Sequence, residues 1–553
     1  MIRERLTDAI AKALKSLGIE TGEFVVEHPA DLSHGDYSTN AAMVAAKATG
    51  SNSREWANKI VVELEKHKPD GVARIDIAGP GFINFHLSRE FFAERVGEIV
   101  RVSSAYGKND SLKGQKVMVE YTDPNPFKEF HIGHLMSNAI GESLSRLVEA
   151  SSAETKRVCY QGDVGMHVAK ALWGKMHKPN ASWGEAYAIG AQEYDKRKED
   201  IDSLNKKIYE RSDKNINALY DEGKQATLAV FENLYAVLGT TFDHYFFETE
   251  AAPVGKKIVE DAVGKVFEES NDAVVFKGEK YGLHTRVFLN SQGIPTYEAK
   301  ELALAKLKYD WFPYDTSIVV TGNEINEYFR VLLAAMREVF PELAAKTKHI
   351  SHGMLRLPSG KMSSRKGNVI TALSLIEEVK DRVREKMEEP DETIAEQVAI
   401  AAIKYSILKQ APGKDITFDF DKSLSFEGDS GPYLQYTAVR ARSVLEKGKA
   451  EQVPTWESDS QVKGEVPEQV TETERLLYRF PEVVEEALTM YAPQQVVHYL
   501  TALAGSFNTF YAKEKIADAK DPRSPYKLAL TRATATVLAN GLWLLGIVVP
   551  TKM

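Results

Sequence analysis

The sequence contains a single cysteine, Cys159, among its 553 residues. One cysteine excludes a disulfide framework and any zinc site that needs several cysteine ligands. Cys159 lies in the run Arg-Val-Cys-Tyr, which is typical of a buried strand, so we interpret it as a packing residue and not as a nucleophile. This cysteine usage fits a reducing compartment, and we expect a cytoplasmic protein.

Long apolar segments are also scarce. Met1 to Leu17 carries charges throughout and has no apolar centre, so we expect no secretory signal. Residues 533–550 contain no charged side chain, but threonine, asparagine and two glycines dilute the run and Pro550 ends it. We expect a packed terminal helix here and no membrane span.

The sequence has no excess of basic residues, since 70 Lys and Arg face 79 Asp and Glu and the net charge is −9. This balance disfavours a protein that coats nucleic acid non-specifically, although a local basic surface remains compatible with it. The apolar fraction of 43% and the charged fraction of 27% are ordinary for a globular protein. A chain of this length exceeds one hydrophobic core and predicts about three domains.

The chain divides into three stretches of different character. Residues 1–104 combine a helical apolar spacing with two alternating runs around Gly79-Pro80-Gly81, which predicts an N-terminal α+β domain. Residues 105–410 alternate apolar strand-like runs with helical ones, which predicts an α/β domain with a parallel sheet buried on both faces. The strand candidates are 116–121, 156–160 and 317–321, and a charged helical insertion is expected at about 190–235. Residues 411–553 lack strand signals and predict an all-α domain.

One candidate site follows the first strand of the α/β domain. His131-Ile-Gly-His134 comes after strand 116–121 and opens a predicted helix at 132–148. A helix N-terminus offers unpaired N–H groups and partial positive charge, which suits phosphate. Both imidazoles can donate to phosphate oxygens, and Gly133 allows close approach to the backbone. The alternative is a histidine-rich loop without function.

A second candidate is Gly360-Lys-Met-Ser-Ser-Arg-Lys-Gly-Asn368, far downstream. Glycines, hydroxyls and the cations Lys361, Arg365 and Lys366 suit a lid that closes over a polyphosphate. Taken alone, this run is equally compatible with a solvated basic loop.

Together the two elements resemble the H-I-G-H and K-M-S-K-S signatures of class I aminoacyl-tRNA synthetases. The arginyl-tRNA synthetase family is resembled most closely, nearly from end to end. The blocks that carry this resemblance are 119–126, 161–165, 242–248, 293–297 and 426–436. The resemblance implies a Rossmann-type catalytic domain between an N-terminal domain that reads the D-loop of tRNA and a C-terminal anticodon-binding domain.

The resemblance also implies the reaction. Arginine and ATP would give arginyl-adenylate and pyrophosphate, and the arginyl group would pass to the 3′ end of tRNA(Arg) with release of AMP. Such catalysis is mainly positioning and charge stabilisation. We expect Mg²⁺ to arrive with ATP without a dedicated protein cage, and no structural metal. A monomer and no membrane partner are expected. The implied ATP-binding residues are His131, Gly133, His134, Gly322, Glu324, Met354, Lys361, Ser363 and Lys366.

The sequence departs from the family pattern in the lid. Ser364 stands where the family motif has its second lysine, so one cation is missing. Arginyl enzymes commonly carry a lysine just before the histidines, which here is Lys128. We hypothesise that Lys128 supplies the absent charge, which makes Lys128, His131, His134 and Lys361 the expected catalytic residues. The alternative is a surface lysine.

A guanidinium substrate needs planar acceptors, because paired N–H···O bonds are strong and selective. By resemblance the arginine-binding residues are Asn125, Glu248, Tyr297 and Glu301. Glu301 is one methylene longer than the family's usual Asp, and Ile325 replaces a usual Gln, for which Asn323 or Asn326 could substitute. Each carboxylate could instead serve a surface salt bridge.

The tRNA contacts implied by the resemblance fall at both ends of the chain. Exposed aromatic and arginine side chains suit stacking on splayed bases, although each of these residues could instead pack in a core. The candidates are Tyr37, Asn84, Tyr433, Tyr436, Arg440 and Met553.

The sequence leaves two rival functions open. A small-molecule adenylyltransferase would also use H-x-G-H on a nucleotide-binding sheet, but it leaves both flanking domains unexplained. A catalytically inactive tRNA-binding relative would not need His131, His134 or Lys361.

Overall fold

The computed structural model describes residues 1–20, 22–357, 370–454 and 465–553. The chain forms two compact units. Unit 1 comprises Met1–Gly107, Arg440–Val483 and Ala502–Leu538, and unit 2 comprises Lys108–Val439, Val484–Thr501 and Ala539–Met553.

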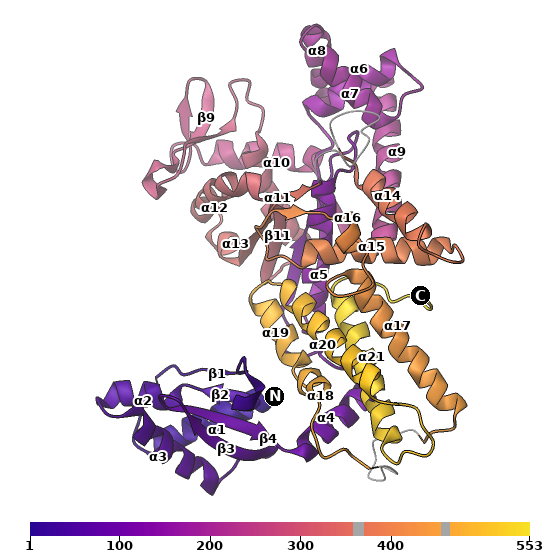
Figure 1. Ribbon diagram of the computed structural model, residues 1–553. Helices are drawn as coiled ribbons and strands as arrows, with labels where there is room; N and C mark the ends of the chain where they lie inside the picture. Colours follow the sequence, from indigo (N-terminus) through magenta and orange to yellow (C-terminus); the bar gives the residue numbers. More distant parts are fainter. Residues whose placement is uncertain (21, 358–369, 455–464) are drawn as a thin grey trace. The chain divides into compact units, whose positions relative to one another are not determined.

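The amino-terminal part of unit 1 is an α+β layer, as the sequence predicts. Its antiparallel sheet has the order β1-β2-β4-β3, and Gly79-Pro80-Gly81 joins β3 to β4 (Figure 1). Gly79 and Gly81 adopt φ angles of 52° and 122°, which favour glycine. Strands and helices here are β1 Val26–Glu27, β2 Tyr37–Thr39, β3 Val72–Ala78, β4 Phe82–Leu87, α1 Ile2–Ser16, α2 Ala41–Thr49, α3 Ser53–Lys66 and α4 Arg89–Val102.

Buried polar pairs join this layer to the helical part of unit 1. Glu482 accepts a hydrogen bond from the Tyr37 hydroxyl and lies 3.2 Å from Nε2 of His28. Arg475 pairs with Asp36, and Glu474 accepts from Arg89 and Tyr526. Burial alone would raise the pKa of Glu482, but hydrogen bonds from His28 and Tyr37 hold it below its usual value. The helices concerned include α18 Glu472–Leu477, α19 Phe480–Thr489 and α21 Ser524–Leu544.

Unit 2 is built on a five-stranded parallel sheet with the order β12-β11-β5-β6-β7. Its strands are β5 Lys116–Glu120, β6 Glu154–Gln161, β7 His244–Phe247, β11 Thr316–Gly322 and β12 Thr347–His352. The predicted parallel sheet is therefore confirmed. Cys159 lies fully buried in β6, as expected of a packing residue. From β5 the chain adds β6 and β7 on one side of the sheet and later adds β11 and β12 on the other side of β5. The strand order therefore reverses between β5 and β11, which is the topological switch point. Ligands of open α/β sheets bind beyond the carboxyl ends of the strands at such a point.

Helices fill the crossovers of this sheet. A small antiparallel sheet, β10-β9-β8, lies between α10 and α11 in the sequence. The elements are α5 Ile132–Ala150, α10 Glu248–Asp261, β8 Glu268–Ser270, β9 Ala273–Phe276, β10 Arg286–Leu289, α11 Tyr297–Trp311, α12 Asn326–Val339 and α13 Pro341–Lys346.

Four helices occupy the connection between β6 and β7. They are α6 Met166–His177, α7 Trp183–Glu193, α8 Lys198–Glu210 and α9 Lys214–Leu238, and α6 and α7 lie side by side (Figure 1). This helical segment begins well before residue 190, where the charge pattern first suggests it. Short polar caps explain its breaks, since the side chains of Ser182 and Asp213 accept hydrogen bonds from the first turns of α7 and α9.

The remaining part of the chain is mostly helical. One departure from the expected all-α character after residue 411 is the short strand β14 Ile416–Thr417, which pairs with β13 Leu355–Arg356. The terminal helix α21 stops at Leu544 and does not continue to Pro550. No helix in the described part of the chain is long and apolar enough to cross a bilayer. Further helices are α14 Ala372–Arg384, α15 Glu392–Leu408, α16 Phe420–Ser423, α17 Gly431–Ala450 and α20 Gln494–Lys513.

The buried pairs of unit 1 lead to a stability prediction. Replacing Glu482 by Ala removes the acceptor of Tyr37 and His28 inside the protein, which we expect to lower the free energy of unfolding by about 3 kcal/mol. Because the pKa of Glu482 is depressed, this contribution is present at neutral pH and is lost as pH falls through its folded pKa.

Urea unfolding at pH 7.5 and at pH 4 measures this effect. Glu486→Ala, on the same helix but exposed, is the control and should cost less than about 0.5 kcal/mol. An equal loss in the two variants at pH 7.5 would contradict the role of Glu482.

Candidate active site at the carboxyl end of the parallel sheet

The loop that follows β5 carries most of the predicted site and has an unusual backbone. Thr122, Asp123 and Phe127 adopt positive φ angles of 81°, 47° and 69°. Non-glycine residues hold such conformations only where neighbours fix them. The Thr122 N–H donates to Ser137 Oγ at 2.9 Å, and Asp123 Oδ1 accepts the N–H of Tyr160 at 2.8 Å.

Phe127 anchors the same loop in the insertion helices. Its side chain is completely buried and its ring lies 5.4 Å from Trp183 and 5.6 Å from Tyr220. Its N–H donates to Thr227 Oγ1 at 3.4 Å. The helices α7 and α9 therefore hold the loop from which Asn125 and Lys128 project.

The two histidines begin α5 and stack on each other. Their ring centroids are 3.6 Å apart with an interplanar angle of 18°. Nδ1 of His131 accepts the N–H of Gly133 at 3.1 Å, and Nδ1 of His134 accepts the N–H of His131 at 3.2 Å. A Cβ on Gly133 would lie 2.9 Å from the His131 ring, so a larger residue here would clash with the observed position of that ring.

The histidines are uncharged at neutral pH. Burial lowers the pKa of His131, with Lys128 adding to this and Glu324 opposing it. Burial also lowers the pKa of His134 well below its usual value, with His131, Lys128 and His352 adding to it. Because each Nδ1 accepts a backbone N–H, the proton of each neutral ring is on Nε2. Both rings therefore offer an Nε2–H donor.

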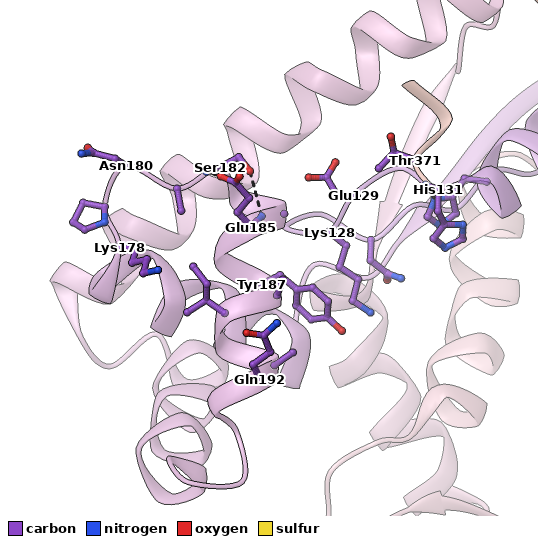
Figure 2. A pocket seen from close by; sticks show the side chains of 18 residues that line it. Lys128, Glu129, His131, Lys178, Asn180, Ser182, Glu185, Tyr187, Gln192 and Thr371 are labelled. Carbon is purple, nitrogen blue, oxygen red and sulfur yellow. Dashed lines mark hydrogen bonds between the residues drawn. The ribbon is translucent and has the colours of Figure 1, made fainter. Parts of the chain in front are cut away.

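A cavity of about 1380 Å³ opens in front of these groups (Figure 2). The loop after β5 contributes Asn125, Lys128 and Glu129, and the opposite wall comes from residues 178–192 at α7. The side chains of Lys128 and Tyr187 point toward each other, with the ammonium 5.2 Å from the ring centroid. Burial lowers the pKa of Lys128, and Lys170 adds to this. The cavity thus combines neutral donors with one partly desolvated cation.

Asn125 and Glu248 converge beside this cavity. Their atoms Oδ1 and Oε1 lie 2.2 and 3.1 Å from the point that a Cβ on Gly162 would occupy. Two oxygen acceptors therefore lie against Gly162, where the Cβ of any other residue would collide with Asn125 Oδ1. Glu248 is the first residue of α10, and its other oxygen, Oε2, accepts from Lys300 at 2.7 Å.

Glu301 lies in the same region, and its surroundings favour the protonated form of its carboxyl group. Burial raises its pKa to about 8, and the nearby Glu120 adds to this rise while Lys308 opposes it. The hydroxyls of Tyr160 and Tyr328, whose pKa values burial also raises, interact electrostatically with Glu301. Tyr297 is 60% exposed, and its ring lies 5.2 Å from the Lys300 ammonium.

The structure brings Asn125, Lys128, His131 and His134 to one cavity. Glu248, Tyr297 and Glu301 do not line that cavity. Glu248 meets the cavity residue Asn125 at Gly162, and Glu301 interacts electrostatically with Glu248. Tyr297 lies beside Lys300, which pairs with Glu248. Gly322 ends β11 and Glu324 follows it, at the switch point beside the histidines. Met354 is half exposed, and its backbone N–H donates a hydrogen bond to Asp415 Oδ1. Lys361, Ser363 and Lys366 lie outside the described residues.

The predicted RNA contacts differ in exposure. Tyr37 and Asn84 are buried, which agrees with the alternative of core packing at these two positions. Tyr37 is fully enclosed, and Asn84 Oδ1 accepts from Ser38 at 2.7 Å. Tyr433, Tyr436 and Arg440 are half-buried on α17, where Arg440 also donates to Asn508. Met553 is exposed.

Sequence reasoning missed Gly162 and Lys300 as members of the site. Gly162 belongs to a block that carries the family resemblance, but its role appears only when Asn125 and Glu248 are seen to meet over it. Lys300 stands one helical turn after Tyr297 in α11, and nothing in the sequence alone distinguishes it from a surface lysine.

Paired histidines at the N-terminus of a helix that follows the central strand of a parallel sheet are typical of class I aminoacyl-tRNA synthetases, and the comparisons show that the chain is one of them. Family models match the chain as the class I (R) tRNA synthetase catalytic domain over residues 96–420, the arginyl-tRNA synthetase N-terminal domain over 2–87 and the DALR anticodon-binding domain over 434–553. The chain belongs to the arginyl-tRNA synthetase family.

Individual relatives extend over the whole chain. An arginine–tRNA ligase of Clostridium perfringens is 28% identical over 100% of this chain and 99% of its own length, and one of Treponema pallidum is 29% identical over 97% and 96%. The arginyl-tRNA synthetase structure of Thermus thermophilus is 25% identical, with a TM-score of 0.80 over the full length of both chains. The Plasmodium falciparum structure shares the fold, with a TM-score of 0.79 at 20% identity. A small-molecule adenylyltransferase is therefore rejected.

The hydrogen bonds of the histidines give a spectroscopic prediction. In ¹H–¹⁵N spectra of the imidazole rings, His131 and His134 should both show the Nε2–H tautomer, with titration midpoints below 6.5 because burial disfavours the charged ring. His131→Gln and His134→Gln assign the signals by loss of one ring each. An Nδ1–H tautomer for either ring would contradict the hydrogen bonds described here.

Proposed function

We propose a set of roles by which individual residues of this chain carry out its reaction. The chain is an enzyme, an arginine–tRNA ligase, which activates L-arginine with ATP and transfers the arginyl group to tRNA(Arg). The observation on which the assignment of roles depends is the meeting of Glu248 Oε1 and Asn125 Oδ1 over Gly162, directly beside the histidine cavity.

ATP binds at the switch point, with its phosphates on the start of α5. His131 and His134 donate from Nε2 to phosphate oxygens, and the N-terminus of α5 adds its partial positive charge. Lys128 lies in the same cavity and adds the cation that Ser364 cannot provide. Gly133, Gly322, Glu324 and Met354 are assigned to the nucleotide by resemblance, as are Lys361, Ser363 and Lys366 beyond the described residues.

The guanidinium of arginine binds over Gly162. Oε1 of Glu248 and Oδ1 of Asn125 accept its N–H groups, and a planar donor fork matches two converging oxygens. Glu301 is proposed as a second acceptor, because an approaching cation would lower its pKa from about 8 and ionise it. Tyr297 is exposed beside Lys300 and is proposed to cover the substrate.

The reaction then requires no covalent intermediate on the protein. The arginine carboxylate oxygen attacks the α-phosphorus, the bond to the bridging oxygen breaks, and pyrophosphate leaves. A ribose hydroxyl of the terminal nucleotide next attacks the arginyl carbonyl, and AMP leaves. We propose that ATP enters as its Mg²⁺ complex, because Mg²⁺ at such sites is held mainly by the substrate phosphates and by water.

The flanking parts of the chain bind tRNA in this proposal. Residues 1–104 form the D-loop domain, 105–410 the catalytic domain and 411–553 the anticodon-binding domain. Tyr433, Tyr436 and Arg440 on α17 contact anticodon bases together with the exposed Met553. Tyr37 and Asn84 are buried and act by supporting the sheet surface. We further propose a cytoplasmic monomer, for which light scattering should give a mass near 61.6 kDa.

A charging panel tests the function. Purified protein, ATP and total tRNA are incubated with each of the 20 amino acids in turn. Arginine alone should be attached, because the acceptor pair selects a planar cation. Charging of another amino acid in place of arginine would overturn the assignment, and no charging at all would indicate an inactive relative.

The role of Lys128 has its own test. Lys128→Ala should lower the rate of tRNA-dependent ATP–pyrophosphate exchange by about 10²-fold or more, because one phosphate-stabilising charge is lost. Lys170→Ala, which removes a neighbouring lysine outside the cavity lining, is the control and should stay within about threefold. Near-normal exchange in Lys128→Ala would contradict the proposal.

A further inference from the structure

A buried ion pair stands next to the proposed arginine site. Lys300 of α11 donates from Nζ to Oε2 of Glu248 at 2.7 Å, and the two side chains are only 7% and 4% exposed. Lys300 belongs to the helix whose first residue is Tyr297, and its ammonium lies 5.2 Å from that ring.

The two oxygens of Glu248 have different surroundings. Oε2 is held by Lys300, whereas Oε1 faces Gly162 and Oδ1 of Asn125. A carboxylate with both oxygens unrestrained could rotate, and its Oε1 would then leave Asn125. The hydrogen bond on Oε2 fixes the orientation that makes Oε1 and Oδ1 a pair of acceptors.

We propose that Lys300 is a positioning residue for the amino-acid substrate: it fixes Glu248 so that Oε1, together with Asn125 Oδ1, meets the guanidinium, and it keeps Glu248 ionised before arginine arrives. The proposal rests on the assignment of Glu248 as an arginine acceptor. Lys300 acts through Glu248 and does not itself touch the substrate.

The electrostatics of the pocket support this role. Glu248 is enclosed by groups from several elements. These are Asp163 after β6, Lys128 in the loop after β5, Lys300, Glu301 and Tyr297 on α11, Tyr160 on β6, Tyr209 on α8 and Tyr328 on α12. Burial raises the pKa of Glu248 and Asp163 adds to it, whereas Lys300 gives the largest opposing effect. A buried carboxylate without its cation takes up a proton, so loss of Lys300 would leave a neutral Glu248.

Lys300→Met tests the inference, because it removes the charge and keeps the length of the side chain. Arginine and ATP KM values are measured in tRNA charging between pH 6 and 8.5. At pH 7 the KM for arginine should rise at least tenfold, while the KM for ATP stays within about twofold. The defect should shrink as pH rises, because Glu248 then loses its proton and regains its acceptor charge.

Three further variants separate the possible causes. Lys300→Arg keeps a cation and should recover most of the affinity for arginine. Glu248→Gln should raise the KM for arginine by a factor that does not change with pH. Lys527→Met removes another buried lysine, which pairs with Glu514 and Asp521 on the helical side of unit 1, and should leave the KM for arginine unchanged.

The double variant Lys300→Met/Glu248→Gln covers the case in which Lys300→Met does not fold. It buries no unpaired charge, and its KM for arginine should equal that of Glu248→Gln alone, since Lys300 acts only through Glu248. A double variant clearly worse than Glu248→Gln would overturn the inference. An unchanged KM in Lys300→Met, or a rise that does not vary with pH, would also overturn it. Wild-type protein that fails to charge arginine would instead refute the proposed function.

Discussion

The order of the parallel strands determines where chemistry can occur in this protein. Because β5 lies at the centre and β11 returns to its other side, the loops that leave these two strands diverge and open a space at their carboxyl ends. One of these loops leads to the histidines at the start of α5, and the other to Glu324. The nucleotide site therefore follows from topology first. The side chains of the site then line the space at the carboxyl ends of β5 and β11.

The burial of charged side chains is the second constraint on this structure, and two of the buried lysines belong to α11. Its Lys300 pairs with Glu248 and its Lys308 with Glu120, both with almost no exposure. A buried pair contributes little net stability, but removing one partner is costly. At Lys308 the consequence is structural, whereas at Lys300 the pair lies at the proposed arginine site. One helix thus joins the core of the sheet to the substrate pocket.

Much of the fold is predictable from local sequence. Strands 116–121, 156–160 and 317–321 are visible as apolar runs because both faces of a parallel sheet are buried. β12 is not visible in this way, since Thr347–His352 is mostly polar and half-buried at the sheet edge. The terminal apolar run was also predictable as a helix, but its end at Leu544 depends on packing.

The site is less predictable than the fold. The histidines are recognisable because their spacing and position are local, whereas Gly162 and Lys300 acquire their roles only through contacts with residues distant in sequence. At Tyr37 the sequence leaves open whether the ring contacts RNA or packs in a core. The structure shows it buried, with its hydroxyl donating to Glu482, hundreds of residues away in the chain. Sequence motifs identify chemistry well and identify burial poorly.

The anchoring of Phe127 has a consequence for how this architecture can vary. Its ring packs against Trp183 and Tyr220, so the insertion helices hold the loop after β5 in place. Residues 166–238 are thus not an accessory that could be trimmed or exchanged independently. A chimera that received this segment from a relative would need side chains that pack around the Phe127 ring in the same way. Without them, the loop that carries Asn125 and Lys128 would lose its strained backbone geometry.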